Sequence, residues 1–346
     1  MREVFGATFD VPDGYLNTAS IGVPPRAAAD AVTTAVAEWA AGAAGPPDFD
    51  AYVAAARAGF AWFVGVEPAD VAIGASVSQL VGLVAASLPD GASVLVADGD
   101  FTSVSFPFAA QGNRGVAVHE VPLDDVASTV GGHDLVAVSV VQSADGRVLD
   151  LDTLREAAEA AGTRVLLDVT QAAGWLPMRL DWVDYVVGGC YKWLLAPRGA
   201  AWLAVRPEAL HTVVAHAANW YAGEDPWDTP YGLPLRLAGG ARGLDLSPVW
   251  LAQVGAAATL PWLRGLHSDG VRAHCVSLAD GLMAGLGLPP AGSAIVAIDV
   301  PGAAATLAEA GVRASVRAGR TRLSFHLYNT VEDVAMVLDA LQRCGR

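Results

Sequence analysis

Strand-like and helix-like stretches alternate along the first two thirds of the chain. Apolar residues at helical spacing predict helices, and short runs rich in β-branched residues, most of them ended by Asp, Gly or Pro, predict strands. The expected helices cover residues 25–43, 50–64, 77–87 and 151–161. The expected strands cover residues 94–97, 116–120, 135–140, 164–168, 185–188 and 201–205. Because strands that alternate with helices pack as a parallel sheet covered by helices, we expect an α/β fold.

The pattern changes at about residue 247. A long Ala-rich helical stretch is followed by short apolar runs over 294–300 and 322–325, which predict strands, and by a last helix over 331–342. This change indicates a second, smaller α+β domain. The expected division is an N-terminal segment over 1–20 that packs with the small domain, a large domain over 21–246 and the small domain over 247–346.

The chain is acidic and carries few charges. Its 36 Asp and Glu residues outnumber its 21 Lys and Arg residues, which gives a formal net charge of −15. A net negative charge repels a phosphate backbone, so we expect no nucleic-acid partner. The longest uncharged stretch, 71–89, contains Ser, Gln and Gly residues and is flanked by Asp70 and Asp90. We therefore expect no membrane span.

Two features favour a cytoplasmic location. Residues 1–14 contain three acidic groups and no apolar core of the length found in secretion signals. The three cysteines, Cys190, Cys275 and Cys344, are widely spaced and show no metal-ligand spacing. An odd count of scattered cysteines favours a reducing compartment over a disulfide framework. We expect a cytoplasmic enzyme without a metal site.

Lys192 is the only lysine, so the other 20 of the 21 basic residues are arginines. Unlike an arginine guanidinium, a lysine amine can lose its proton near neutral pH and form a Schiff base. Lys192 lies in an apolar run over 186–195, where a charged ammonium is costly. It lies just after the predicted strand 185–188, and Asp168 ends the predicted strand 164–168. Ligands of open α/β sheets collect at the carboxyl ends of strands. The sequence therefore predicts an acid and an amine in one crevice, although a lysine reaching solvent from a strand end would fit the same run.

Six short segments carry a family resemblance through their order and spacing. Two of them are Leu166-Leu167-Asp168-Val169-Thr170-Gln171-Ala172 and, with Lys192 placed 24 residues after Asp168, Tyr191-Lys192-Trp193-Leu194. The other four cover residues 15–19, 74–76, 101–103 and 322–329. Together they resemble the class V aminotransferase group of fold type I pyridoxal-phosphate enzymes, which includes cysteine desulfurases, kynureninases and isopenicillin N epimerase-like proteins. The resemblance implies a seven-stranded, mixed but mostly parallel sheet between helices in the large domain.

The resemblance also implies roles around the ring of pyridoxal 5'-phosphate. Lys192 would form a Schiff base with the cofactor and move the α-proton of the substrate as general base and acid. Asp168 would pair with the pyridine nitrogen and keep it protonated. Phe101 would stack on the ring, unless it only packs in the core. Gln171 would hydrogen-bond the ring 3-oxygen, unless it only covers the start of a helix.

Other residues resemble those that hold the phosphate of the cofactor. Gly74, Ala75 and Ser76 precede a predicted helix, whose positive amino end binds phosphate through backbone N–H groups. Ser76 could equally be a simple helix cap. Tyr191 resembles the kynureninase tyrosine that contacts the phosphate.

Two residues imply a partner subunit. Trp220 and Ser247 lie where the family takes phosphate contacts from the neighbouring chain, which implies a homodimer with active sites shared between subunits. Either residue could instead be ordinary interface or helix-cap material.

Two further residues are expected to bind a small amino-acid substrate. Arg322 resembles the arginine that clamps the substrate α-carboxylate, unless it is a surface arginine, and Asn17 is also expected to contact the substrate. One of Arg313, Arg317 and Arg320 is a candidate to contact a second acidic group of the substrate.

The reaction is left open between several outcomes. Desulfurases carry a nucleophilic cysteine on a loop before the carboxylate-binding arginine, and the corresponding loop here, 311–319, has none. Persulfide chemistry is therefore not favoured. The first hypothesis is an aminotransferase-like enzyme acting at Cα of an amino acid. The alternatives are a lyase that cleaves a C–S or C–C bond, an epimerase, and a non-catalytic protein that binds the cofactor.

Overall fold

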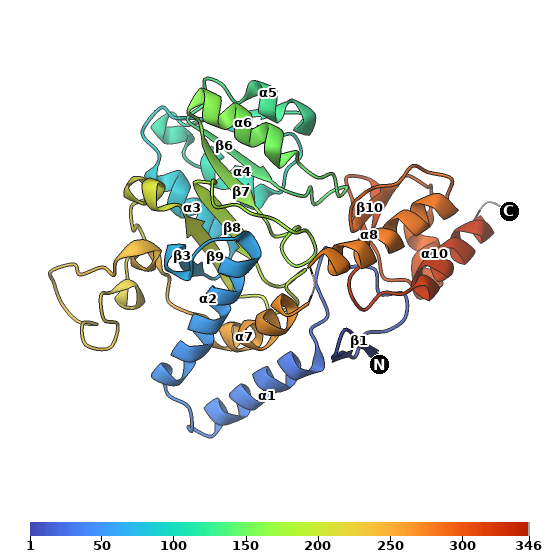
Figure 1. Ribbon diagram of the computed structural model, residues 1–346, viewed down its shortest axis with the longest axis horizontal. Helices are drawn as coiled ribbons and strands as arrows, with labels where there is room; N and C mark the ends of the chain where they lie inside the picture. Colours follow the sequence, from blue (N-terminus) through green and yellow to red (C-terminus); the bar gives the residue numbers. More distant parts are fainter. Residues whose placement is uncertain (267, 345–346) are drawn as a thin grey trace.

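The computed structural model describes residues 1–266 and 268–344, and a seven-stranded sheet lies at the centre of its larger part (Figure 1). From one edge to the other the strands are β3 (Val71–Gly74), β9 (Ala201–Val205), β8 (Tyr185–Gly189), β7 (Arg164–Asp168), β6 (Leu135–Ser139), β4 (Ser93–Ala97) and β5 (Ala117–Val121). Neighbouring strands from β8 to β5 are parallel, and β9 is antiparallel to both of its neighbours. The predicted mixed, mostly parallel sheet is confirmed.

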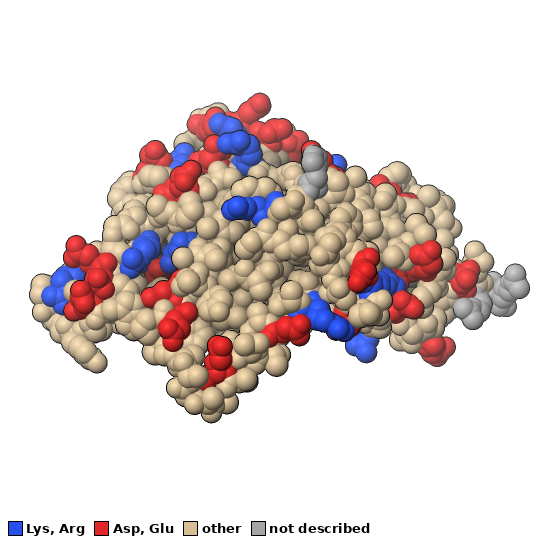
Figure 2. Space-filling model, turned by 60° about the horizontal axis from the view of Figure 1, so that its bottom comes forward, with Lys and Arg blue, Asp and Glu red and all other residues tan. Residues whose placement is uncertain are grey.

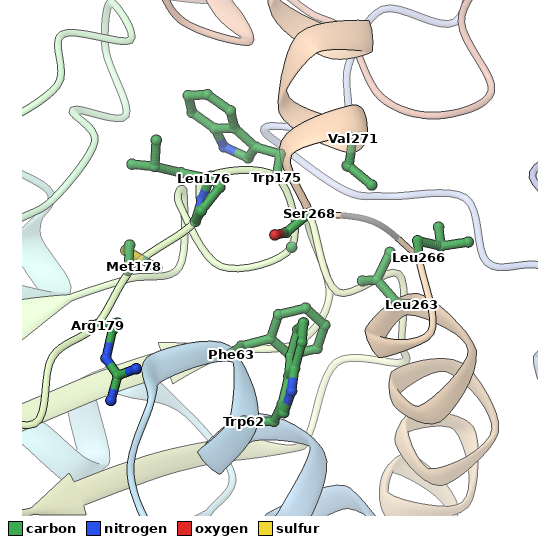
Figure 3. Close-up of a pocket in the computed structure, with 12 residues that line it drawn as sticks. Trp62, Phe63, Trp175, Leu176, Met178, Arg179, Leu263, Leu266, Ser268 and Val271 are labelled. Atoms are coloured by element: carbon green, nitrogen blue, oxygen red, sulfur yellow. The ribbon is translucent and has the colours of Figure 1, made fainter.

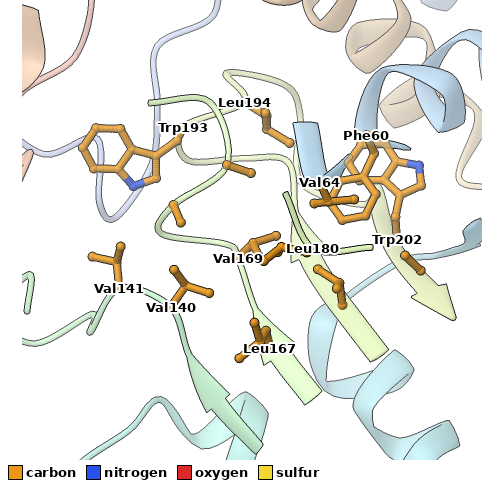
Figure 4. Packing of buried hydrophobic residues seen from close by; sticks show 14 of the residues in the cluster. Phe60, Val64, Val140, Val141, Leu167, Val169, Leu180, Trp193, Leu194 and Trp202 are labelled. Atoms are coloured by element: carbon orange, nitrogen blue, oxygen red, sulfur yellow. The ribbon is translucent and has the colours of Figure 1, made fainter. Parts of the chain in front are cut away.

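Helices cover both faces of this sheet. One face is covered by α2 (Asp50–Val64), α5 (Val126–Thr129), α6 (Leu151–Ala161) and α7 (Trp250–Arg264), and the other by α3 (Val77–Ser87) and α4 (Thr102–Ala109). Side chains of the strands alternate between these two cores, and the central strands are buried along their whole length. Figure 4 shows the first core, in which Phe60 of α2 stacks on Trp202 of β9 at 5.1 Å between ring centroids.

A buried ion pair fixes the edge of the sheet where β3 lies. Arg57 of α2 donates to both carboxylate oxygens of Asp245, at 2.9 and 2.7 Å, and Asp245 also accepts from the backbone N–H of Ile73 at 2.9 Å. The pair joins α2, β3 and the segment after the 3₁₀ helix η7 (Gly240–Leu244), and so fixes the position of the residues that follow β3.

A smaller three-stranded sheet follows. Its order is β10 (Ile295–Ile298), β12 (Arg320–Ser324) and β11 (Ser315–Arg317), and both pairs are antiparallel. The helices α8 (Ser268–Gly285), α9 (Ala303–Glu309) and α10 (Val331–Cys344) contribute to its core. The predicted small C-terminal sheet domain is present.

The N-terminal segment runs along this smaller sheet. It contains β1 (Arg2–Val4) and β2 (Ala7–Phe9) and leads into α1 (Arg26–Ala40). Arg2 and the backbone N–H of Gly14 both bind the carboxylate of Asp333 in α10. Asn17 forms an isolated parallel β-bridge, through the backbone, with Ser324 of β12.

The surface reflects the low charge content. Figure 2 shows acidic and basic side chains scattered in small groups around a broad stretch that carries neither. Within residues 1–266 and 268–344, no helix is both long and apolar enough to cross a membrane.

Candidate active site

A pocket lies beyond the carboxyl ends of β7 and β8, next to the start of α3. It brings together seven of the predicted site residues: Ala75, Ser76, Phe101, Asp168, Gln171, Tyr191 and Lys192. These residues come from segments up to 117 positions apart in the numbering, from 75 to 192, so the sheet topology assembles the site.

The loop that carries Lys192 is held tightly from two sides. The backbone N–H of Gly22 donates to the carbonyl of Tyr191 at 2.9 Å. A Cβ added at Gly22 would lie 2.1 Å from the carbonyl oxygen of Lys192, and one added at Gly174 would lie 2.6 Å from that of Trp193. The loop is therefore held between two chain segments, and each segment has a glycine at the contact because any side chain there would clash with the loop.

The Lys192 amine lies in a buried, largely aromatic environment. Its Nζ is 5.1 Å from the ring centroid of Phe101 and 5.7 Å from that of Tyr191. Burial lowers the pKa of Lys192 to about 8, an effect opposed by Asp168 and reinforced by Arg322 and other arginines. A lysine with such a pKa offers a neutral amine at mildly alkaline pH.

Asp168 is a buried carboxylate that faces the same pocket. Its Oδ1 accepts from the backbone N–H of Thr170 at 2.8 Å. Burial raises its pKa to about 6, while the hydrogen bonds from Thr170 and the charge of Lys192 act in the opposite direction. No ion pair within 4 Å is found for it in the described part of the chain. A buried carboxylate without a close cation suits a site that receives a positively charged group, as a protonated pyridine nitrogen would be.

Gln171 lines the pocket, but its hydrogen-bonding groups are engaged within the protein. Its Nε2 donates to the carbonyl of Ala19 and to Ser143 Oγ, both at 3.0 Å, and its Oε1 accepts from Trp193 Nε1 at 2.8 Å. Both amide hydrogens thus have acceptors, so Gln171 would have to release one of them to bind a ring oxygen. Ser143 Oγ accepts from Gln171 and from Arg322 at 3.1 Å, which leaves its own hydroxyl hydrogen free to donate.

Arg322 lies behind Ser143 and is only 1% exposed. Its guanidinium donates to the hydroxyls of Ser315 at 3.2 Å and Ser20 at 2.7 Å, besides Ser143. All of these partners are neutral, and burial lowers its pKa to about 10. A buried guanidinium that has only neutral partners fits the predicted role of binding a carboxylate.

The start of α3 forms the other end of the pocket. Ser76 precedes the helix, and its side chain does not cap the first turn. The backbone N–H groups of that turn and the Ser76 hydroxyl therefore fit a phosphate. Gly74 does not line the pocket. A Cβ added at Gly74 would lie 2.8 Å from the side chain of Leu80, so this position has no room for a larger residue. Arg198 stacks over Tyr191, with Cζ 5.3 Å from the ring centroid, and adds a cation to the pocket lining.

Five predicted site residues do not line this pocket: Gly74 and Arg322, described above, and Trp220, Ser247 and Asn17. Trp220, in the 3₁₀ helix η6 (Trp220–Ala222), packs against Trp227, and Ser247 is exposed. Asn17 lines a neighbouring hollow together with Ser315, and its buried Oδ1 has no hydrogen-bond partner. Within one chain, Trp220, Ser247 and Asn17 are not part of the pocket of Lys192.

Several pocket residues were not predicted from the sequence. They are Ser139, Ser143, Thr170 and Arg198, together with Ser78 and Ser103. Ser139 ends β6, and Asp100 accepts from its backbone N–H at 2.7 Å and from its hydroxyl at 2.5 Å. The sequence could have indicated Ser139 and Ser143, because polar residues at or just after the end of the predicted strand 135–140 lie at the same sheet edge as Asp168.

A second hollow lies between the ends of α2 and α7 and the segment 174–179 (Figure 3). Its lining is mainly apolar, with Trp62, Phe63 and Trp175 among its residues. Arg179 is the one ionisable side chain among its described lining residues, so this hollow does not pair an amine with a carboxylate as the pocket of Lys192 does.

Comparisons with known proteins agree with this geometry. Residues 48–288 match the family model described as aminotransferase class-V. The chain belongs to the class V aminotransferase family. An uncharacterised aminotransferase, YcbU of Bacillus subtilis, is 30% identical over 83% of this chain and 82% of its own length. Isopenicillin N epimerase of Streptomyces clavuligerus is 29% identical over 68% of this chain and 66% of its own.

Solved structures share the fold. A cysteine desulfurase from Thermococcus onnurineus superimposes with a TM-score of 0.84 and 19% identity, over 96% of this chain and 94% of that one. A cystine C–S lyase variant with glycine covalently linked to its PLP cofactor superimposes with a TM-score of 0.83 and 20% identity, over 96% of both chains. Membership of the family confirms the predicted enzyme class and cofactor, pyridoxal 5'-phosphate. The roles of individual residues stay predictions.

Proposed function

We propose that this member of the family is an aminotransferase that acts at Cα of an amino-acid substrate. The observation that carries the proposal is that Lys192 and Asp168 line one pocket, with Arg322 directly behind its wall, where Arg322 donates to Ser143 Oγ at 3.1 Å. Lys192 has a lowered pKa, Asp168 is a buried carboxylate, and Arg322 has no acidic partner in the described part of the chain. An amino acid presents complementary groups, since its carboxylate fits Arg322 while its amine and Cα lie toward Lys192.

Each residue would contribute a distinct step. When bound, pyridoxal 5'-phosphate supplies an electron sink that makes the Cα–H bond of an amino acid acidic. Lys192 would hold the cofactor and then carry the proton from Cα, which its lowered pKa favours. Asp168 would keep a positive charge on the ring nitrogen, and the first turn of α3 with Ser76 would hold the phosphate. Phe101 would stack on the ring and exclude water from that face, and Tyr191 would contact the phosphate.

The cysteines support this assignment over persulfide chemistry. Cys190 donates through Sγ to the carbonyl of Pro197 at 2.8 Å, and burial raises its pKa to about 12. Cys275 is also buried, and burial raises the pKa of its thiol as well. Neither of these thiols lines the pocket, so neither is placed to attack a substrate.

A homodimer in the cytoplasm forms part of the proposal. Large apolar side chains are exposed on the segment between η6 and η7, with Tyr231 88%, Leu233 89% and Leu235 66% exposed. A second copy of the chain would cover such side chains and could bring Trp220 and Ser247 to the phosphate of its partner's site. The scattered cysteines favour the reducing cytoplasm.

The test is turnover by the purified holoenzyme with and without a keto-acid acceptor. An aminotransferase needs the acceptor and releases no ammonia. Release of pyruvate, alanine, sulfide or ammonia without an acceptor would indicate a C–S or C–C lyase, and inversion at Cα alone would indicate an epimerase. In either case the proposal fails. Lys192→Ala should abolish turnover and the visible absorption band, and a band that survives dialysis of this variant would contradict the role of Lys192.

A further inference from the structure

The β11–β12 hairpin places three arginines on one face. In its register Arg317 is directly opposite Arg320, and Ser315 is directly opposite Arg322. Because opposite residues share a face and positions two apart do so as well, Arg317, Arg320 and Arg322 project from the same side. The connecting residues, Ala318 at φ 46° and Gly319 at φ 77°, are both left-handed, as in the tight turns that fix a hairpin register.

Only one of these three arginines has an acidic partner in the described part of the chain. Arg320 binds Asp145 at 3.2 Å. Arg322 and Arg317 instead converge on one hydroxyl, since their Nη2 atoms lie 2.7 and 3.4 Å from Ser20 Oγ. The two positive charges repel each other, and this repulsion from Arg317 contributes to lowering the pKa of Arg322. In a chain with net charge −15, two unpaired guanidinium groups side by side indicate a site for anions.

The two arginines differ in depth. Arg322 is buried behind Ser143, which lines the pocket of Lys192, whereas Arg317 is exposed. The charge of Arg317 still reaches Lys192, whose pKa it helps to lower. An anion held by Arg317 would thus lie outside the α-carboxylate and close enough to belong to the same molecule.

We propose that Arg317 binds a second acidic group of the substrate, so that the enzyme selects amino acids with an anionic side chain over their neutral analogues. The inference rests on the proposed function, in which Arg322 binds the α-carboxylate. A charge-assisted hydrogen bond at such a site favours the acidic substrate by a factor on the order of ten.

The test compares matched acidic and neutral ligands on the holoenzyme. Calorimetry gives the Kd of glutarate and of pentanoate, which has one carboxylate fewer, and kinetics give kcat/KM for glutamate against glutamine and aspartate against asparagine. The wild type should prefer the acidic member by about tenfold. Arg317→Gln should bring the ratio close to one while the Kd of pentanoate stays the same. Arg272→Gln removes an equal charge from the exposed surface of α8 and should keep the preference.

Failure of the Arg317 role and failure of the proposed aminotransferase activity give different results. Equal binding and equal kcat/KM for acidic and neutral members, or a preference that survives in a folded Arg317→Gln protein, would overturn the role of Arg317 and leave the aminotransferase standing. Absence of turnover with every amino acid would instead contradict the proposed function. The ratio of Kd values still decides the role of Arg317 in that event.

Discussion

At the scale of single residues, chemistry was easier to predict than hydrogen bonding. Lys192 stands out as the only lysine, and Asp168 as the acid at the end of a buried strand, so both could be assigned to one crevice before the fold was known. The hydrogen bonds that occupy the Gln171 amide could not be predicted, because its acceptors belong to Ala19 and Ser143, which lie 152 and 28 positions away. Contacts at such separations depend on the assembled sheet.

The lowered pKa of Lys192 predicts how the apoprotein takes up its cofactor. Only the neutral amine reacts with an aldehyde, so the loading rate should rise with pH through about 8 rather than through the ordinary 10.5. Borohydride reduction followed by mass spectrometry of the peptide containing Lys192 measures the loaded fraction at each pH. N-acetyl-lysine provides the unshifted control.

Substitution of Asp168 should change the pH midpoint of cofactor loading in a known direction. Asp168 raises the pKa of Lys192, so Asp168→Asn should move the midpoint of the loading profile below pH 8. A midpoint near that of N-acetyl-lysine in the wild type, or a shift upward in the variant, would show that burial does not control this amine.

At the scale of elements, long periodic stretches were predicted well and short ones were missed. The expected helix over 50–64 and strand over 164–168 coincide with α2 and β7. β3 was missed because its four residues merge with α3 into one uncharged stretch, and β11 because Ser315–Arg317 shows no apolar run. The single long Ala-rich helix expected after residue 247 was wrong, since two helices, α7 and α8, are found there. Edge strands of three or four residues are specified by their neighbours in the sheet more than by their own sequence.

The clamp on the Lys192 loop gives a prediction about an element rather than a side chain. In Gly22→Ala the new methyl group would meet the Lys192 carbonyl at 2.1 Å, so the loop must shift. A displacement of about 1 Å can reduce catalysis by about a hundredfold, and we expect a loss of at least tenfold in kcat/KM with the protein still folded. Gly281→Ala is the matched control, because its methyl group would meet nothing within 4 Å and it lies in α8. Equal kcat/KM in Gly22→Ala and the wild type would show that the loop tolerates the shift.

At the scale of the whole molecule, one chain forms most of the pocket but leaves Trp220 and Ser247 outside it. The sequence resemblance assigns these two residues to the partner's site, and within one chain neither of them lines the pocket of Lys192. If they act across a dimer, each active site combines Lys192 from one subunit with Trp220 and Ser247 from the other.

Mixed dimers test this arrangement directly. Lys192→Ala should be inactive, and the double variant Trp220→Ala with Ser247→Ala should lose most of its activity. When the two variants are refolded together, random pairing makes about half of the dimers mixed, and each mixed dimer has one site with both defects and one site with none. Activity should therefore return to about a quarter of the wild-type value, because one intact site forms in every two dimers. If Trp220 and Ser247 acted within their own chain, every site would carry one defect and no activity would return, and a monomer in light scattering would exclude the shared site altogether.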